Sequence, residues 1–211
     1  DGSETAEKWV EGLVGNRTTF QPRRTIIVDL RGDPEAWLER MKQKHRYNIR
    51  LAIKKDVVVQ ASEDIGVFHK MMQITGQRDT FGVHTQAYYQ TVYDQFSADE
   101  RCVLLLASFQ GVPLAGVLVL RQGERAWYFY GASTNLERQR MPAYLLQFEA
   151  MKWAKEHGCL EYDLWGVPDE DEETLEREFD SRNDGLWGVY RFKRGFGGQL
   201  KRSTAAMEKV Y

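Results

Sequence analysis

The sequence predicts an α+β fold in which a mixed sheet, with an antiparallel meander at its centre, is flanked by helices. Residues 101–131 read as three consecutive strands joined by Gln-Gly turns, which is typical of a meander. Segments on both sides of it carry apolar residues at helical spacing. Strands and helices do not alternate regularly, so a doubly wound dinucleotide-binding fold is not expected.

The composition suits one large domain or two small ones and excludes a disordered chain. Of the 211 residues 42% are hydrophobic and 12% aromatic, and the formal net charge is −2. The longest apolar run, residues 114–120, is far shorter than the roughly 20 residues of a membrane helix. Cys102 and Cys159 lie in apolar runs and are expected to be buried thiols, which fits a cytoplasmic compartment. No Cys/His cluster has metal-ligand spacing, so no metal is expected.

The first half of the chain predicts short elements in sequence. Residues 9–14 have the spacing of a short helix, and the β-branched run at residues 25–30 predicts a strand. Asp33 and Pro34 are typical of an N-cap and a first helical residue, so a helix begins there. A strand is then expected at residues 57–59, a helix capped by Ser62, and another helix opened by Thr85.

A basic helix is predicted at residues 44–55. We expect Tyr47, Leu51 and Ile53 to face inward while the cations face solvent. After the meander, a helix is expected at residues 142–157, a strand from Cys159, an irregular acidic segment from residue 169, a short helix at residues 184–194 and a glycine-rich turn and strand to the end.

The common nucleophile motifs are missing. There is no G-x-S-x-G elbow, no H-E-x-x-H zinc motif and no P-loop. Burial of the two cysteines would disfavour their thiolates, so covalent catalysis is not expected. For the four histidines a surface or capping role is favoured over catalysis; they are His45, His69, His84 and His157.

Two concentrations of positive charge interrupt a nearly neutral chain. Residues 42–55 hold six Lys or Arg and no acid, and residues 186–206 are also free of acids. Each can be a solvated face, or can attract a polyanion such as phosphate or RNA. The candidate polyanion-binding residues are Lys44, Arg46, Arg50 and Arg194.

The junction between the third meander strand and the following helix is a second candidate site. The helix begins at Pro142, where free backbone N–H groups can hold an anion. Arg138 and Arg140 lie just before it, and Tyr144 lies in its first turn. The alternative is an ordinary loop with two exposed arginines.

Three runs in this order and spacing resemble the Fem family, the tRNA-dependent aminoacyltransferases that build peptidoglycan interpeptide bridges. They are MKQKHRYNIRLAIKK, RMPAYLLQFEAMKWAKEHGCLEYDLWG and GVYRFKRGFGG. Members are two fused GNAT-type acetyltransferase folds, and the resemblance covers the second. It therefore implies a GNAT-like acyltransferase domain at residues 21–211, a remnant or linker at residues 1–20, and a missing first fold.

The resemblance implies aminoacyl-tRNA as co-substrate, no bound cofactor, and a nucleotide-linked or lipid-linked peptidoglycan precursor as acceptor. The junction RQRMPA lacks the first glycine of the coenzyme A motif, and proline has no N–H to donate. Arg140 and Tyr144, with Arg138 beside them, match residues that contact the precursor, whereas Phe192 and Lys193 match a pair near the aminoacyl end of the tRNA.

The implied reaction is aminolysis of an ester. The resemblance implies that it takes place in the cytoplasm, either free or at the inner face of the membrane. Lys193 is suited to stabilising the tetrahedral oxyanion. Asp163 is a candidate for accepting the amine proton, or it caps a turn. Two alternatives remain open, a coenzyme A-dependent GNAT enzyme acting on a small amine and a noncatalytic RNA-binding module.

Overall fold

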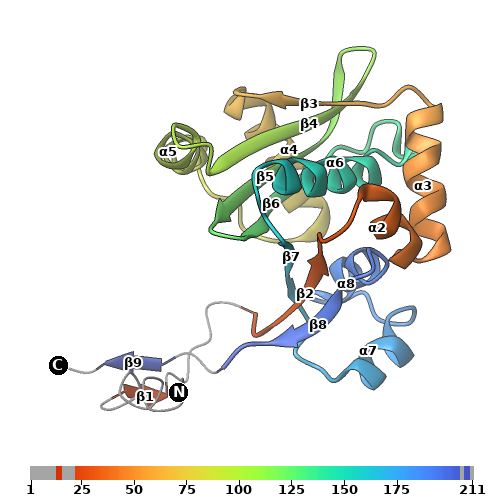
Figure 1. The fold of residues 1–211 in the computed structure, drawn as a ribbon. Helices are drawn as coiled ribbons and strands as arrows, with labels where there is room; N and C mark the ends of the chain where they lie inside the picture. Colours follow the sequence, from red (N-terminus) through yellow and green to blue (C-terminus); the bar gives the residue numbers. More distant parts are fainter. Residues whose placement is uncertain (1–12, 16–21, 205–206, 210–211) are drawn as a thin grey trace.

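The computed structural model describes residues 13–15, 22–204 and 207–209, and its main body is one seven-stranded mixed sheet (Figure 1). The strand order is β3-β4-β5-β6-β7-β2-β8, and every neighbouring pair is antiparallel except β6 and β7. The predicted α+β class and its central meander are therefore confirmed. The strands are β2 (Arg24–Asp29), β3 (Val58–Ser62), β4 (Cys102–Phe109), β5 (Val112–Gln122), β6 (Arg125–Ser133), β7 (Glu161–Val167) and β8 (Gln199–Arg202), with a separate pair formed by β1 (Leu13–Gly15) and β9 (Met207–Lys209).

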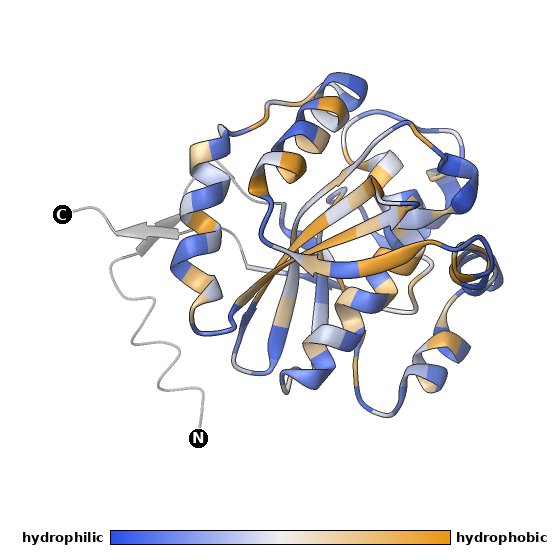
Figure 2. Ribbon diagram, turned by 90° about the horizontal axis from the view of Figure 1, so that it is seen from above, coloured by the Kyte–Doolittle hydropathy of each residue, from blue (hydrophilic) through white to orange (hydrophobic). Residues whose placement is uncertain are grey.

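Helices cover both faces of the sheet, as Figures 1 and 2 show. One hydrophobic core joins the sheet to α2, α3, α6, α7 and α8, and a second joins it to α4 and α5. None of the helices among the described residues is long and apolar enough to span a membrane. The helices are α2 (Pro34–Arg40), α3 (Gln43–Lys54), α4 (Ile65–Asp79), α5 (Gln86–Ser97), α6 (Pro142–Glu156), α7 (Glu172–Glu178) and α8 (Trp187–Lys193), and a short 3-10 helix, η1, covers Arg138–Arg140.

Strand β4 shows how the meander supplies both cores. Successive side chains of a strand point to opposite faces, so Val103 and Leu105 enter one core while Leu104 enters the other. This explains why the central strands are apolar almost without interruption (Figure 2). Cys102 and Cys159 are buried free thiols, as predicted, and burial raises the pKa of Cys102 to about 12.

The capping signals located several helix starts correctly. The Asp33 carboxylate accepts the Ala36 N–H at 2.9 Å, with Pro34 at the first helical position. Thr85 caps α5 in the same way. Pro142 opens α6, as predicted.

Other local predictions were wrong. Leu13 and Val14 belong to strand β1, while the remainder of the helix predicted at residues 9–14 and most of residues 1–20 lie outside the described part of the chain. Asp64, not Ser62, caps α4 with its carboxylate, and the Ser62 hydroxyl instead accepts the Asp64 N–H. The division of the chain at residue 20 stays a prediction.

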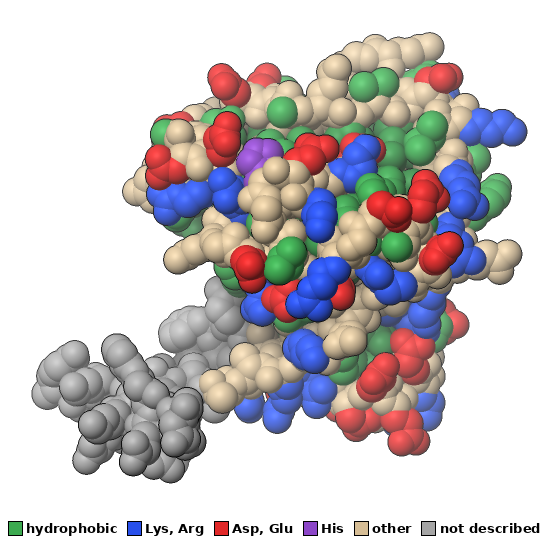
Figure 3. All heavy atoms as spheres, in the orientation of Figure 1, with side chains coloured by type: hydrophobic (Ala, Val, Ile, Leu, Met, Phe, Trp, Pro, Cys, Tyr) green, Lys and Arg blue, Asp and Glu red, His purple; other side chains and the backbone are tan. Residues whose placement is uncertain are grey.

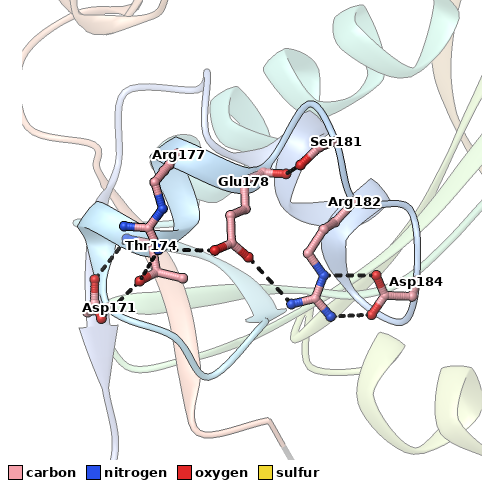
Figure 4. Close-up of polar contacts among 7 residues, drawn as sticks. All are labelled: Asp171, Thr174, Arg177, Glu178, Ser181, Arg182 and Asp184. Atoms are coloured by element: carbon pink, nitrogen blue, oxygen red, sulfur yellow. Dashed lines mark hydrogen bonds and ion pairs between the residues drawn. The ribbon is translucent and has the colours of Figure 1, made fainter.

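The acidic segment expected to be irregular contains helix α7. Asp171 caps it by accepting the Thr174 N–H at 2.8 Å, and acids in its first turn are favoured by the helix dipole. Figure 4 shows how hydrogen bonds and ion pairs continue from this cap through Glu178 to the pair between Arg182 and Asp184. This network orders the path from α7 towards α8.

The face of α3 that turns inward is also not the predicted one. Tyr47 and Ile53 are 62% and 56% exposed, whereas His45, Asn48 and Ile49 are buried against α6. Two of these buried side chains are polar, so an apolar pattern alone points to the wrong side of the helix.

Candidate active site

The sheet divides where β6 and β7 stop pairing, and this divergence of the two strands is called the opening below. The two strands pair in parallel only from Arg125 and Glu161 to Trp127 and Asp163. Beyond that point β6 continues with β5, and β7 continues with β2. Register shifts occur in both of these pairings, and such irregularities bend strands away from each other. Side chains that follow the last pair therefore line a divergence at the carboxyl end of both strands.

Lys193 reaches this opening from the last turn of α8. Its Nζ donates a hydrogen bond to the Gly166 carbonyl oxygen at 2.8 Å and lies 5.4 Å from the centre of the Tyr128 ring. The side chain is buried, and burial lowers the pKa of Lys193 to about 7, while the negative charge of Asp163 opposes the shift. Near neutral pH the amine therefore exists in both protonation states.

Asp163 has the structural role that was considered for it and also faces Lys193. Its Oδ1 accepts the Trp165 N–H at 2.7 Å and the Thr25 hydroxyl. Trp165 has a φ of +63°, an unfavourable value for a residue with a side chain. The carboxylate thus holds the backbone at Trp165, two residues beyond the last β6–β7 pair.

Tyr144 and Phe192, predicted on separate segments, are brought together by the fold. Their ring centres are 5.1 Å apart, and the buried ring of His45 lies 5.0 Å from that of Tyr144. His45 Nε2 contacts the Phe192 carbonyl oxygen at 2.7 Å. The surface role considered for His45 was wrong, because its neighbours on α6 and α8 are invisible in the local sequence, and its contact with a carbonyl in the last turn of α8 is of the capping kind.

Arg140 is not the exposed residue that was expected. Its guanidinium pairs with Glu137 at 2.7 Å, donates to the Lys55 carbonyl oxygen at 2.7 Å and stacks over the Phe109 ring. These contacts tie η1 to the end of α3 and to β4. Arg138 is exposed, as predicted.

The helix start at Pro142 does not form an open anion cradle. The N–H groups of Arg140, Met141 and Tyr144 all donate to carbonyl oxygens within residues 137–141, and Pro142 has no N–H. Three backbone N–H groups at this junction are therefore already engaged within the protein, and Pro142 supplies none.

The candidate polyanion-binding residues divide into two pairs. Lys44 and Arg50 are exposed on α3. Arg46 donates to the Met41 carbonyl oxygen, and Arg194 forms a two-pronged ion pair with Glu176. The guanidinium groups of Arg46 and Arg194 therefore already bind partners within the protein. Figure 3 shows cations mixed with acids over this view of the molecule, with acidic side chains gathered around α7.

An aromatic cluster beside the opening was missed. Tyr88 and Tyr130 meet through their hydroxyl oxygens at 3.0 Å, and His84 stacks on Tyr88 with ring centres 4.1 Å apart. Phe129 links this cluster to Trp165, whose ring centre lies 5.5 Å away. Tyr88 is 39% exposed, so part of the cluster is open to solvent.

The comparisons with known proteins agree with this architecture. A family model described as the FemAB family matches residues 5–111 and 108–205. The lipid II:glycine glycyltransferase of Staphylococcus epidermidis RP62A is 25% identical over 95% of this chain, and that of Staphylococcus aureus USA300 is 24% identical over the same share. The chain spans about 61% of the length of these curated relatives.

Solved structures show a similar fold. The crystal structure of FemX superimposes with a TM-score of 0.85 at 21% identity, covering 100% of this chain and 69% of that one. The C-terminal domain of a putative lysylphosphatidylglycerol synthetase from Agrobacterium fabrum has a TM-score of 0.60 at 15% identity, covering 93% of this chain and 62% of that domain. The likeness to FemX confirms the predicted fold class.

Proposed function

This chain belongs to the FemAB family, and we propose that it transfers an amino acid from aminoacyl-tRNA to a side-chain amine in the stem peptide of a lipid-linked peptidoglycan precursor. The printed activity of its curated relatives, glycyl transfer to lipid II, supports this acceptor. The observation that carries the proposal is the buried Lys193 at the opening between β6 and β7.

The reaction needs no covalent enzyme intermediate. The amine nitrogen attacks the carbonyl carbon of the aminoacyl ester, the bond from that carbon to the ribose oxygen breaks, and the proton lost by the amine ends on the ribose hydroxyl. Negative charge develops on the carbonyl oxygen in the transition state. A lysine held out of water exerts a stronger field on that charge than an exposed one would. Lys193 fits this role when it is protonated.

The acceptor and donor enter from different sides in this proposal. The cluster of His84, Tyr88 and Tyr130, which Phe129 links to Trp165 on β7, offers ring faces and hydroxyl groups to the precursor. Lys44 and Arg50 are exposed on α3 and offer positive charge to the tRNA backbone.

The proposal is tested by following labelled glycine. The full-length protein is incubated with [14C]glycyl-tRNA and lipid II, and the label in the extracted lipid is counted. Parallel reactions replace the donor with glycyl-coenzyme A, or replace lipid II with the nucleotide-linked precursor. Label in lipid II from glycyl-tRNA is expected. Transfer from glycyl-coenzyme A but not from glycyl-tRNA would contradict the proposal. Absence of transfer from every member of a panel of aminoacyl-tRNAs would contradict it as well.

A further inference from the structure

A buried histidine lies at the end of the helix that carries Lys193. His45 is 5% exposed and is enclosed by the rings of Tyr144, Phe196 and Phe192, with the first two ring centres 5.0 and 4.7 Å away. Gly195 completes the enclosure, because a Cβ on it would lie 2.0 Å from His45 Cε1. The imidazole therefore has one position available to it.

The polarity of its hydrogen bond can be assigned. A carbonyl oxygen only accepts, so at 2.7 Å His45 Nε2 must donate to Phe192 O. Burial lowers the pKa of His45, which favours a neutral ring with the proton on Nε2. Nδ1 is left bare and has no partner among the described residues. An unpaired buried nitrogen costs free energy, and the bond made by the other ring nitrogen offsets part of that cost.

Phe192 precedes Lys193 in the last turn of α8. Carbonyls in that turn lack partners within their helix, and His45 supplies one from α3. The next residue directs its Nζ to Gly166 on β7. We propose that His45 is a positioning residue that caps α8 and thereby holds the Lys193 amine in the opening between β6 and β7.

This inference rests on the proposed function for its catalytic meaning, but it can be tested without activity. His45→Met and His45→Gln are a matched pair of similar size, of which only Gln retains an N–H that can reach Phe192 O. The Lys193 side chain is followed by 15N NMR of lysine-labelled protein, with the Lys193→Met spectrum identifying its signal.

In the parent and in His45→Gln, Lys193 is expected to titrate near 7. In His45→Met it should titrate about one pH unit or more higher, towards the ordinary lysine value, because the amine is no longer held in its buried position. An unchanged titration in folded His45→Met would overturn the proposal. If His45→Met does not fold, His45→Asn takes its place. The same rise in the Lys193 pKa is expected, because the shorter amide of Asn cannot reach the Phe192 carbonyl oxygen.

Activity gives the second readout. With kcat and KM measured for glycyl-tRNA, His45→Met should lose about tenfold or more in kcat with little change in KM, whereas His45→Gln should recover most of it. Equal losses in both variants, or a loss confined to KM, would also overturn the positioning role. Absence of transfer in the parent protein would refute the proposed function. The NMR titration would still decide whether His45 positions the Lys193 amine.

Discussion

At the scale of single residues, the least expected observation is that Lys193 is buried. A lysine in a solvated cationic cluster was one of the two readings of its sequence neighbourhood, and the aromatic residues around it were the only local signal for burial. The local sequence gave no sign that Nζ meets Gly166, because that contact joins residues 27 positions apart. Arg140 shows the same limit, since its partners on α3 and β4 are distant in sequence.

The burial of Lys193 predicts a pH-dependent cost to stability. Its folded pKa of about 7 is below the ordinary value of 10.5, so between these values the unfolded chain binds more protons than the folded one. The unfolding free energy of the parent relative to Lys193→Met should therefore rise by up to about 1.4 kcal/mol per pH unit from pH 7 to 10. Urea unfolding at several pH values measures this, and a constant difference would show that the amine is solvated.

Arg140 is predicted to contribute to stability. Arg140→Ala removes an ion pair to Glu137, a hydrogen bond to Lys55 and a stacking contact on Phe109, and should lower the unfolding free energy by about 1–3 kcal/mol. Arg138→Ala, at an exposed position in the same turn, is the control and should change it by less than about 0.5 kcal/mol. Equally small effects in the two variants would show that Arg140 does not stabilise the fold and is available to bind a ligand.

At the scale of elements, capping residues were informative and amphipathic patterns were less so. Asp33, Thr85 and Pro142 mark helix starts because they act within one turn of their own position. The Asp171 cap of α7 is the same signal, but the surrounding run of acids concealed it. The orientation of α3 depends instead on which side chains α6 and α8 can accommodate.

The close approach of α8 to α3 makes Gly195 sensitive to substitution. In Gly195→Ala the new methyl group would overlap the fixed ring of His45, so the unfolding free energy should fall by about 1–3 kcal/mol. Gly188→Ala is the matched control, because it lies on α8 with open space around the added carbon. It should be neutral or stabilising by up to about 1 kcal/mol, from helix propensity. Thermal melts compare the stabilities of the two variants. An equal effect in both would show that the His45 ring moves to accommodate the methyl group.

At the scale of the whole molecule, the sheet explains why a site forms where it does. One parallel pair in an otherwise antiparallel sheet separates at its carboxyl end, and Lys193 and Asp163 reach that opening from different parts of the chain. The family resemblance indicated Lys193, whereas residue patterns alone could not place its amine beside β7. The net charge of −2 also conceals an uneven distribution of cations.

That distribution predicts a salt-dependent interaction with tRNA. Lys44→Glu and Arg50→Glu should each weaken tRNA binding and reduce the slope of log Kd against log salt by about 1, since each removes a phosphate contact. Lys70→Glu, an exposed cation on α4 at the other face of the sheet, should have little effect. Fluorescence anisotropy between roughly 50 and 200 mM salt makes the comparison. Equal slopes of log Kd against log salt in all three variants would show that the cations of α3 are solvated and do not contact tRNA.

The most direct test of the account is the turnover of Lys193→Met, compared with the parent across pH. The substitution keeps much of the stem and removes the charge, so kcat for transfer from glycyl-tRNA to lipid II should fall about 100-fold or more at pH 6.5, with KM largely unchanged. Because Lys193 loses its proton around pH 7, the ratio of parent to variant should shrink as the pH rises above that value. Lys193→Arg, which keeps the charge with a different shape, should retain more activity than Lys193→Met at high pH. Turnover of Lys193→Met within about threefold of the parent at pH 6.5 would contradict the account, because one oxyanion stabiliser is worth far more than that.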